Sequence, residues 1–332
     1  MAHQLEGKMV IGVSSRALFD LTIENEIFEK EGLEAYCSYQ VEHEQDILRP
    51  GPGFGLIKSL LKLNEYGKEK DLVEVIIMSR NSPDSSLRVF NSIAHYGLNI
   101  TRSVLVSGAS LAPYLTAFRT DLFLSAYEDD VQSAIDSGIA AGIICTEHSG
   151  HGNPAQPRLS GHREAAGLAE VIPMQARTCP EIRIAFDGDA VLFTDESEMI
   201  FKEKGLSAFE ENERSRAREP LAEGPFAKFL KKLSDLQREL GTMDCPIRTA
   251  LVTSRCAPAH ERVLRTMRSW NVRVDEAFFL GGLEKREVLK AFGAQIFFDD
   301  QSIHTASAAQ SVPAARVPYG RAAEAGKLRE KA

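Results

Sequence analysis

A segment near the start of the chain occurs again in its second half. Residues 13–36 read VSSRALFDLTIENEIFEKEGLEAY, and residues 186–209 read FDGDAVLFTDESEMIFKEKGLSAF. The two segments align without a gap, so that Gly32 corresponds to Gly205 (205 − 32 = 173). An internal repeat constrains the fold strongly, because both copies are expected to form the same structural unit.

The correspondence continues well beyond this segment. Gly51 corresponds to Gly224 at the same offset (224 − 51 = 173), and LFLSA at 122–126 corresponds to IFFDD at 296–300 (296 − 122 = 174). The offset therefore drifts very little along the whole of each half. The sequence predicts two copies of one fold in a single chain.

Each copy shows short apolar segments that alternate with helical patterns. The predicted strands of the first copy are 9–13, 73–78, 103–106, 122–126 and 140–146, and those of the second are 183–186, 249–253, 277–280, 296–300 and 315–320. Buried strands that alternate with helices are typical of a parallel sheet covered by helices. We therefore expect an α/β protein made of two tandem, doubly wound parallel-sheet units that arose by internal duplication.

The length of 332 residues is also typical of two domains. We expect a first half at 1–145, a linker at 146–180, a second half at 181–320 and a tail at 321–332. A segment at about 194–248 is long enough for a small helical cap on the second half. The linker is rich in Gly and Pro, and we expect its His148, His151 and His162 to lie in a solvated loop rather than in a metal site.

Charge and hydropathy exclude several kinds of partner. The net charge is −8 and basic residues do not cluster, so we expect no nucleic-acid partner. No apolar run approaches the roughly 18 residues that span a bilayer, and the start of the chain has no secretory pattern. The five cysteines are far apart and are expected to be reduced thiols. These features predict a cytoplasmic protein without a membrane segment.

Polar residues follow each strand of the second copy that faces the expected ligand crevice. Ligands of open parallel sheets bind outside the carboxyl ends of the strands, where such residues can meet. Glycine within the first group allows a tight turn there. In chain order the residues are Asp187, Gly188 and Asp189, then Thr253 and Ser254, then Lys285, and finally Asp299 and Asp300.

This order resembles the four-motif signature of the haloacid dehalogenase superfamily, which is Asp-x-Asp, then Thr or Ser, then Lys, then an acidic pair. The resemblance implies a haloacid-dehalogenase-like fold and a magnesium-dependent phosphatase. Asp187 would attack phosphorus as the nucleophile. Asp189 would protonate the leaving oxygen and then activate water.

The same resemblance implies how metal and phosphate are held. Asp187, the backbone carbonyl of Asp189, and Asp299 would bind Mg²⁺, with Asp300 in support. The phosphoryl oxygens would be bound by Lys285, Thr253, Ser254 and the turn at Gly188. Taken singly, Lys285 could be a surface lysine and Asp299-Asp300 a helix cap. Arg255 and His304 lie close by in sequence and are further candidate contacts.

The first copy lacks these residues. Ser14 stands where the second copy has Asp187, Arg16 stands at Asp189, Met78 at Thr253, Leu111 at Lys285, and Ser125-Ala126 at Asp299-Asp300. We expect this half to have no phosphatase chemistry. It is either a scaffold or subunit interface, or a pocket in which Ser14, Arg16, Arg80 and Asn81 contact part of the substrate or a nucleotide effector.

Further segments resemble the cytosolic 5'-nucleotidase I family over nearly the whole chain; they include SSRALFDL, IFEKEGLEAY, NSIAHYGLNI, FDGDAVLFTDESE, CPIRTALVTSR, TMRSW, DEAFFLGG and FFDDQ. The resemblance implies Mg²⁺-dependent hydrolysis of nucleoside 5'-monophosphates, preferably AMP. It also implies a nucleotide effector and a homo-oligomer. A phosphatase of sugar phosphates and a nucleotide-binding regulatory protein remain as alternatives. Phe209, Phe226 and Phe229 either stack on a base or belong to the core.

Overall fold

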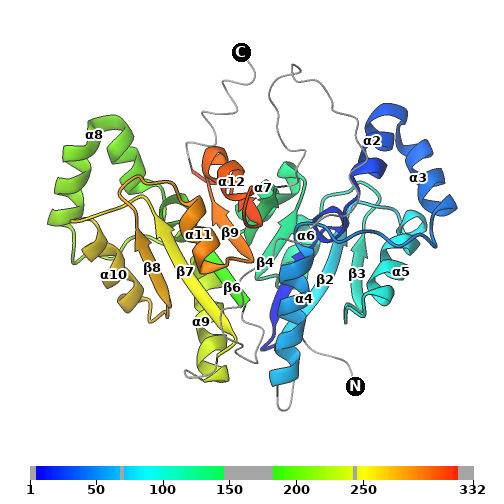
Figure 1. Ribbon diagram of the computed structural model, residues 1–332, viewed down its shortest axis with the longest axis horizontal. Coiled ribbons are helices and arrows are strands. Elements are labelled where there is room, and N and C mark those ends of the chain that lie inside the picture. Colours follow the sequence, from blue (N-terminus) through cyan, green and yellow to red (C-terminus); the bar gives the residue numbers. More distant parts are fainter. Residues whose placement is uncertain (1–4, 68–70, 146–181, 242–244, 321–332) are drawn as a thin grey trace.

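The computed structural model describes residues 5–67, 71–145, 182–241 and 245–320. The predicted linker, with its three histidines, and the predicted tail lie outside these residues. The described residues form a single ten-stranded sheet with helices packed against it (Figure 1).

The strands lie where the sequence pattern predicts them, to within a few residues. The first half contributes β1 (Met9–Val13), β2 (Val73–Ser79), β3 (Arg102–Leu105), β4 (Leu122–Ser125) and β5 (Ala140–Ile144). The second half contributes β6 (Ile182–Phe186), β7 (Ile247–Thr253), β8 (Glu276–Phe279), β9 (Ile296–Asp299) and β10 (Ala314–Arg316). Most of their residues are apolar and buried, as expected for strands covered on both faces.

The two halves have the same strand order when each is read from its own outer edge toward the middle of the sheet. It runs β3-β2-β1-β4-β5-β10-β9-β6-β7-β8, so that β1 and β6 occupy equivalent places. Within each half all neighbouring strands are parallel. The predicted α/β class with a mostly parallel sheet is therefore confirmed.

The two halves join through one antiparallel pair, which the sequence did not predict. Strand β5 pairs with β10, and Ala315 lies opposite Ile144. Gly142 permits this approach, because a Cβ at that position would lie 2.9 Å from the Cβ of Ala315. A salt bridge of 2.8 Å between Arg316 and Glu128 also connects the halves. The sheet is thus continuous through the middle of the molecule.

The helices are also repeated in order. The first half has α1 (Ser15–Leu18), α2 (Thr22–Glu31), α3 (Leu33–Glu42), α4 (Phe54–Lys62), η1 (Leu63–Tyr66), η2 (Asp84–Ser86), α5 (Leu87–His95), α6 (Ala112–Ala117) and α7 (Glu128–Asp136). The second half has the turn η3 (Gly188–Leu192), α8 (Glu196–Ser215), α9 (Ala227–Leu240), α10 (His260–Ser269), α11 (Arg286–Phe292) and α12 (Ser302–Ala308).

Helix α8 bends sharply at Gly205, whose φ is +81°, and α2 meets α3 at Gly32, whose φ is +89°. Left-handed backbone of this kind favours glycine, which explains why glycine occurs at both equivalent positions. The two bent elements lie at opposite ends of the molecule (Figure 1). Helix α8 buries only Ser197 and Glu213, so most of it stands away from the core.

Helix α9, in contrast, belongs to the core. Its Phe229, Leu230 and Leu233 are buried, and Phe226 just before the helix packs against Phe186 and Phe298 of the sheet. Phe226 and Phe229 are therefore core residues, which was one of the two interpretations of these aromatic side chains. Phe209 on α8 remains half-buried.

The strand register corrects one correspondence between the halves. Val13 pairs with Ile77 on β2, and β2 ends at Ser79, whereas β7 ends at Thr253. Ser79 pairs with Leu105 as Thr253 pairs with Phe279, at the same offset of 174. The prediction that Met78 occupies the place of Thr253 is therefore wrong by one residue. The sequence favours the other correspondence, because the Ser-Arg pairs at 79–80 and 254–255 match at an offset of 175, one residue away from the strand register.

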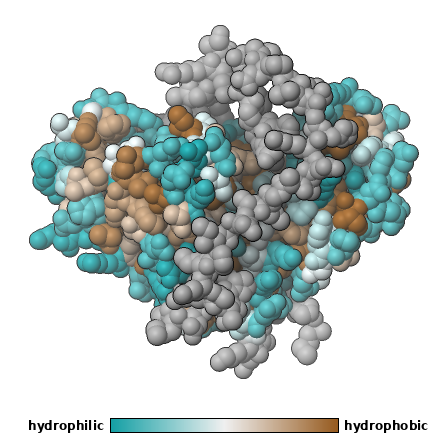
Figure 2. All heavy atoms as spheres, in the orientation of Figure 1, coloured by the Kyte–Doolittle hydropathy of each residue, from teal (hydrophilic) through white to brown (hydrophobic). Residues whose placement is uncertain are grey.

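None of the helices in the described ranges combines the length and hydropathy that a bilayer span requires. On the face shown in Figure 2, hydrophobic and hydrophilic side chains alternate in small groups over the described surface.

Gly51 and Gly224 each face a neighbouring segment of backbone. A Cβ on Gly51 would lie 2.8 Å from the carbonyl carbon of Phe19, and one on Gly224 would overlap the carbonyl oxygen of Phe193. An isolated antiparallel β-bridge pairs Phe19 with Pro50 in the first half, and an equivalent one pairs Phe193 with Glu223 in the second. Close backbone contact therefore explains why the sequence repeat retains glycine at these two positions.

We expect Gly224→Ala to lower the free energy of unfolding by about 1–3 kcal/mol, because neither backbone segment can move aside without strain. Urea denaturation measures the change. Gly55→Ala is the matched control, since a Cβ at this exposed helical position meets nothing within 4 Å, and it should be neutral or slightly stabilising. Equal stability of Gly224→Ala and the unsubstituted protein would contradict the steric explanation.

Candidate active site

Asp187 directly follows β6 and is the most central residue of the predicted site. Its backbone N–H donates to the carbonyl oxygen of Phe298 at 2.8 Å, which continues the ladder between β6 and β9. Its side chain is buried. The first predicted residue is thus fixed to the sheet at the carboxyl end of a central strand.

The ammonium group of Lys285 lies between two carboxylates. Its Nζ is 2.8 Å from Oδ1 of Asp187 and 2.6 Å from Oδ2 of Asp299. Lys285 is the residue before α11 and is only 3% exposed. It is therefore not a surface lysine, and it links the ends of β6 and β9. His304 on α12 also approaches Asp299, with Nδ1 3.2 Å from Oδ2.

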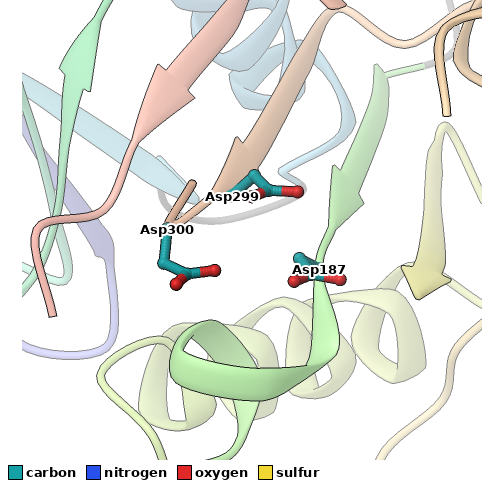
Figure 3. A group of neighbouring side chains, drawn as sticks. All are labelled: Asp187, Asp299 and Asp300. Atoms are coloured by element: carbon teal, nitrogen blue, oxygen red, sulfur yellow. The ribbon is translucent and has the colours of Figure 1, made fainter. Parts of the chain in front are cut away.

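Asp187, Asp299 and Asp300 form a compact acidic group. Each offers an oxygen within 4.8 Å of the others, and all three lie at the ends of the adjacent strands β6 and β9 (Figure 3). Oδ1 of Asp300 is buried and has no hydrogen-bond partner among the described residues. Carboxylate oxygens in this arrangement fit a hard divalent cation.

The charges of this group change the pKa of each member. Burial, together with the charges of Asp299 and Asp189, raises the pKa of Asp187 to about 7, although Lys285 opposes the change. Burial and the charges of Asp187 and Asp299 raise the pKa of Asp300 to about 9. For Asp299, Lys285 and His304 outweigh burial and lower the pKa. Repulsion among the carboxylates is therefore only partly compensated by Lys285.

Thr253 and Gly188 meet beside Asp187. Thr253 ends β7 and is buried, and a Cβ on Gly188 would lie 3.2 Å from its Oγ1. Ser254, the next residue, is exposed. The turn that follows Asp187 is unusual, because Ala190 has a φ of +59°. Its counterpart Ala17 lies in the short helix α1, so this turn differs between the halves.

The side chain of Asp189 is turned toward Arg255 and is not part of the acidic group. Nε of Arg255 donates to Oδ2 at 2.8 Å, and Nη2 donates to Oδ1 at 2.6 Å. This is a bidentate ion pair, the strongest form of arginine–carboxylate contact. Arg255 was a candidate contact from its position in the sequence, and the structure brings it to the site.

The other side of Arg255 contacts α8. Nη1 donates to Glu213, which also accepts from Nη1 of Arg262 at 2.9 Å and from Oγ of Ser197 at 2.8 Å. The side chains of Glu213 and Arg262 are fully buried. Sequence reasoning missed both residues, because each belongs to a segment rich in charged residues of both signs. Only the fold distinguishes them from surface residues.

The four candidate residues of the first half lie at the carboxyl ends of β1 and β2. Oγ of Ser14 accepts from the N–H of Ala17, and Arg16 donates to Oδ1 of Asn25 at 2.6 Å. Arg80 donates to Asp130 at 2.8 Å, and the backbone N–H of Asn81 donates to Oγ of Ser79. Ser14 occupies the place of Asp187 and Arg16 that of Asp189, and the side chains of Ser14, Arg16 and Arg80 have hydrogen-bond partners among the described residues.

The fold and the site together define an α/β protein with a lysine-bridged acidic centre at the carboxyl ends of its central strands. A family model described as 5'-nucleotidase matches residues 1–324. The chain belongs to the 5'-nucleotidase family. Human cytosolic 5'-nucleotidase 1B is 38% identical over 306 residues. The match covers 89% of this chain but 46% of that protein, so the chain spans about half the length of this relative.

Two solved structures align with most of this chain at low similarity. The structure of a Pnkp1/Rnl/Hen1 complex aligns with 96% of this chain and 99% of its own, at 10% identity and a TM-score of 0.29. Histidinol dehydrogenase from Elizabethkingia anophelis aligns with 92% of this chain and 79% of its own, at 10% identity and a TM-score of 0.20.

We expect the metal-free protein to lose stability as the pH rises from 6 to 8.5. The folded protein holds a proton on Asp300 up to a pKa of about 9, whereas the unfolded chain releases it near the ordinary value of 3.8. The folded state therefore binds more protons in this range, and the free energy of unfolding falls with pH by roughly 1–3 kcal/mol. Urea denaturation in the presence of a chelator measures the fall.

Asp300→Asn is the control, because it removes one of the two carboxyl groups that titrate in this interval, with little change of shape, and leaves Asp187 with its pKa of about 7. Its stability should depend less on pH over the same interval. An unchanged slope in this variant would show that other groups cause the dependence.

Proposed function

We propose that the protein is a 5'-nucleotidase that hydrolyses nucleoside 5'-monophosphates, AMP foremost, to nucleoside and phosphate through an aspartyl-phosphate. The main support is the buried contact of Lys285 with Asp187 and Asp299, next to Asp300, in a chain of the 5'-nucleotidase family. Such a cluster provides a nucleophile, cation ligands and a positive charge in one place.

Mg²⁺ is the cation that we propose for this centre. Three crowded carboxylates, with a buried Oδ1 of Asp300 that has no partner among the described residues and with raised pKa values of Asp187 and Asp300, fit a divalent cation. Asp187, Asp299 and the backbone carbonyl of Asp189 would hold the ion, and Asp300 would support it. When bound, the ion would neutralise part of the phosphate charge and polarise the phosphoryl oxygens.

The residues around Asp187 fit a two-step reaction. An oxygen of Asp187 attacks phosphorus, the bond to the 5'-oxygen breaks, and Asp189 gives the leaving oxygen a proton. Asp189 then takes a proton from water as the water oxygen attacks phosphorus, and phosphate leaves Asp187. Lys285, Thr253, Ser254 and the turn at Gly188 would bind the phosphoryl oxygens and stabilise their charge.

The fold also supports a more specific origin. We propose that the two halves are haloacid-dehalogenase-like units from an internal duplication, with the catalytic unit at 181–320 and the degenerate one at 1–145. The equivalent strand orders, the paired glycines and the bends at Gly32 and Gly205 support this origin. The cap would be α8 alone, because α9 packs in the core.

Phe209 on α8 is the aromatic residue that we propose for contact with the base. It is half-buried, and the guanidinium carbon of Arg255 lies 5.4 Å from its ring centre. It therefore lies close to the residue that holds Asp189. An apolar ring beside Arg255 fits a nucleoside better than a sugar phosphate, which remains the alternative substrate.

The name of the human relative places that protein in the cytosol, and we propose the same location here. We also propose a homo-oligomer. Phe28 and Leu33 are exposed at one bent element, and their counterparts Phe201 and Leu206 are exposed at the other. Light scattering of the purified protein would test the oligomer.

The first test compares the unsubstituted protein with Asp187→Asn in the presence of Mg²⁺. We expect phosphate release from AMP to fall by at least about 10³-fold in the variant, because the amide is not a nucleophile toward phosphorus. IMP, CMP and a sugar phosphate serve as comparison substrates. Full activity of Asp187→Asn would exclude the mechanism, and preference for the sugar phosphate would select the alternative substrate.

For the first half we propose a pocket that contacts substrate or a nucleotide effector through Ser14, Arg16, Arg80 and Asn81. Arg16 carries a positive charge in the place of Asp189, and its guanidinium lies 5.6 Å from the ring centre of Tyr127. An arginine beside an aromatic ring is a chemistry that suits a nucleotide.

We expect Arg16→Ala to raise the Michaelis constant for AMP, or to weaken the response to added ADP, by about 3–10-fold through the loss of one charge contact. The turnover number should stay constant. If neither quantity changes, the first half is a scaffold.

A further inference from the structure

The ion pair between Asp189 and Arg255 holds the proposed proton-transfer residue in one orientation. Both oxygens of Asp189 are engaged, by Nε at 2.8 Å and by Nη2 at 2.6 Å. The side chain of Arg255 is 2% exposed, and that of Asp189 is 18% exposed. The guanidinium is therefore closed off from solvent, whereas the carboxylate of Asp189 remains partly exposed.

The same guanidinium reaches the bent helix. Its third nitrogen, Nη1, donates to Glu213, which is fully buried near the end of α8. Glu213 also accepts from Ser197 near the start of α8, so it connects the two arms of the bend. Arg255 is thus a direct link between the carboxylate at the site and the element that we propose as the cap.

The first half provides an internal comparison for this link. By strand register and offset, Asn81 occupies the place of Arg255, and Arg16 occupies the place of Asp189 (255 − 81 = 174; 189 − 16 = 173). The neighbouring buried arginine is retained, because Arg88 corresponds to Arg262 (262 − 88 = 174).

Arg88 forms an ion pair with Glu24, so the half without catalytic residues still uses a buried arginine to hold its bent helices. The fold therefore requires the arginine of α5 and α10 but not the one that follows β7. Arg255 is therefore found in the half that has Asp189, and the half that keeps only the scaffold has no arginine at this position.

We infer that Arg255 is a positioning residue for proton transfer, which orients Asp189 toward the leaving oxygen and ties that orientation to α8. The inference rests on the proposed function. Arg255 gives up no proton and forms no bond to phosphorus. Its contribution is preorganisation, because two parallel hydrogen bonds from a planar guanidinium fix a carboxylate more closely than a single charge does.

Substrates with different leaving groups distinguish a positioning role of Arg255 from a purely structural one. The alkoxide released from AMP is strongly basic and needs a proton from Asp189, whereas p-nitrophenolate departs without one. A residue that acts through Asp189 should therefore matter for AMP and matter little for p-nitrophenyl phosphate. A residue that only supports the fold should affect both substrates alike.

The test is Arg255→Lys, which keeps the positive charge but cannot form the bidentate pair. Single-turnover release of nucleoside and of p-nitrophenol, with Mg²⁺ present, isolates the first chemical step. We expect a loss of about 10–100-fold with AMP and of less than about 3-fold with p-nitrophenyl phosphate, within the range that general acid catalysis contributes. In an Asp189→Asn background, Arg255→Lys should cause little further loss with AMP.

Arg262→Lys is the matched control, because the guanidinium of Arg262 contacts Glu213 and the backbone of Glu219 and does not pair with Asp189. It should slow both substrates by the same factor. Melting temperatures of both variants are measured alongside, and Arg255→Gln is the second variant at the site. If both Arg255 variants melt below the assay temperature while Arg262→Lys folds, Arg255 is a structural residue and the inference is wrong.

Three kinetic results would also overturn the inference. They are an equal loss with both substrates, the same leaving-group selectivity in Arg262→Lys, and a full further loss when Arg255→Lys is added to Asp189→Asn. A failure of the proposed function is different, because the unsubstituted protein would then hydrolyse neither phosphate ester.

Discussion

The contact of one buried ammonium with two buried carboxylates organises this protein. Lys285 approaches Asp187 at the end of β6 and Asp299 at the end of β9, and all three are almost fully enclosed. Transferring such charges from water is costly unless each is closely paired. The ends of both strands and the start of α11 must therefore keep their relative positions for these charges to stay paired.

The antiparallel contact of β5 with β10 decides the shape of the whole molecule. It joins two parallel half-sheets that have the same order of strands, so the chain has one continuous core and two equivalent sets of strand ends. Only one set is acidic. The other holds Ser14, Arg16 and Arg80 in the equivalent places, with partners from within its own half. One half can therefore specialise in chemistry while the other retains the scaffold and its own polar surface.

Charge pairs also extend from the site to the periphery. Asp189 contacts Arg255, Arg255 contacts Glu213, and Glu213 contacts both Ser197 and Arg262. Little apolar surface fixes α8, since Ser197 and Glu213 are its buried residues. Polar contacts therefore contribute much of what holds this helix, and they connect it to Asp189 through Arg255.

The sequence by itself determined the strands, their order along the chain and the residues that follow them. Apolar periodicity and the repeat can be read along the chain without knowledge of tertiary contacts. For the same reason it predicted that Asp187, Lys285 and Asp299 lie together. It placed the first-half counterpart of Thr253 at Met78 instead of Ser79, since both residues continue an apolar strand. Only the tertiary structure decided the antiparallel contact of β5 with β10, the place of α9 in the core, and the roles of Glu213 and Arg262. These features depend on contacts between residues far apart in the chain. The sequence does not distinguish a solvated charged residue from one that is buried against an opposite charge.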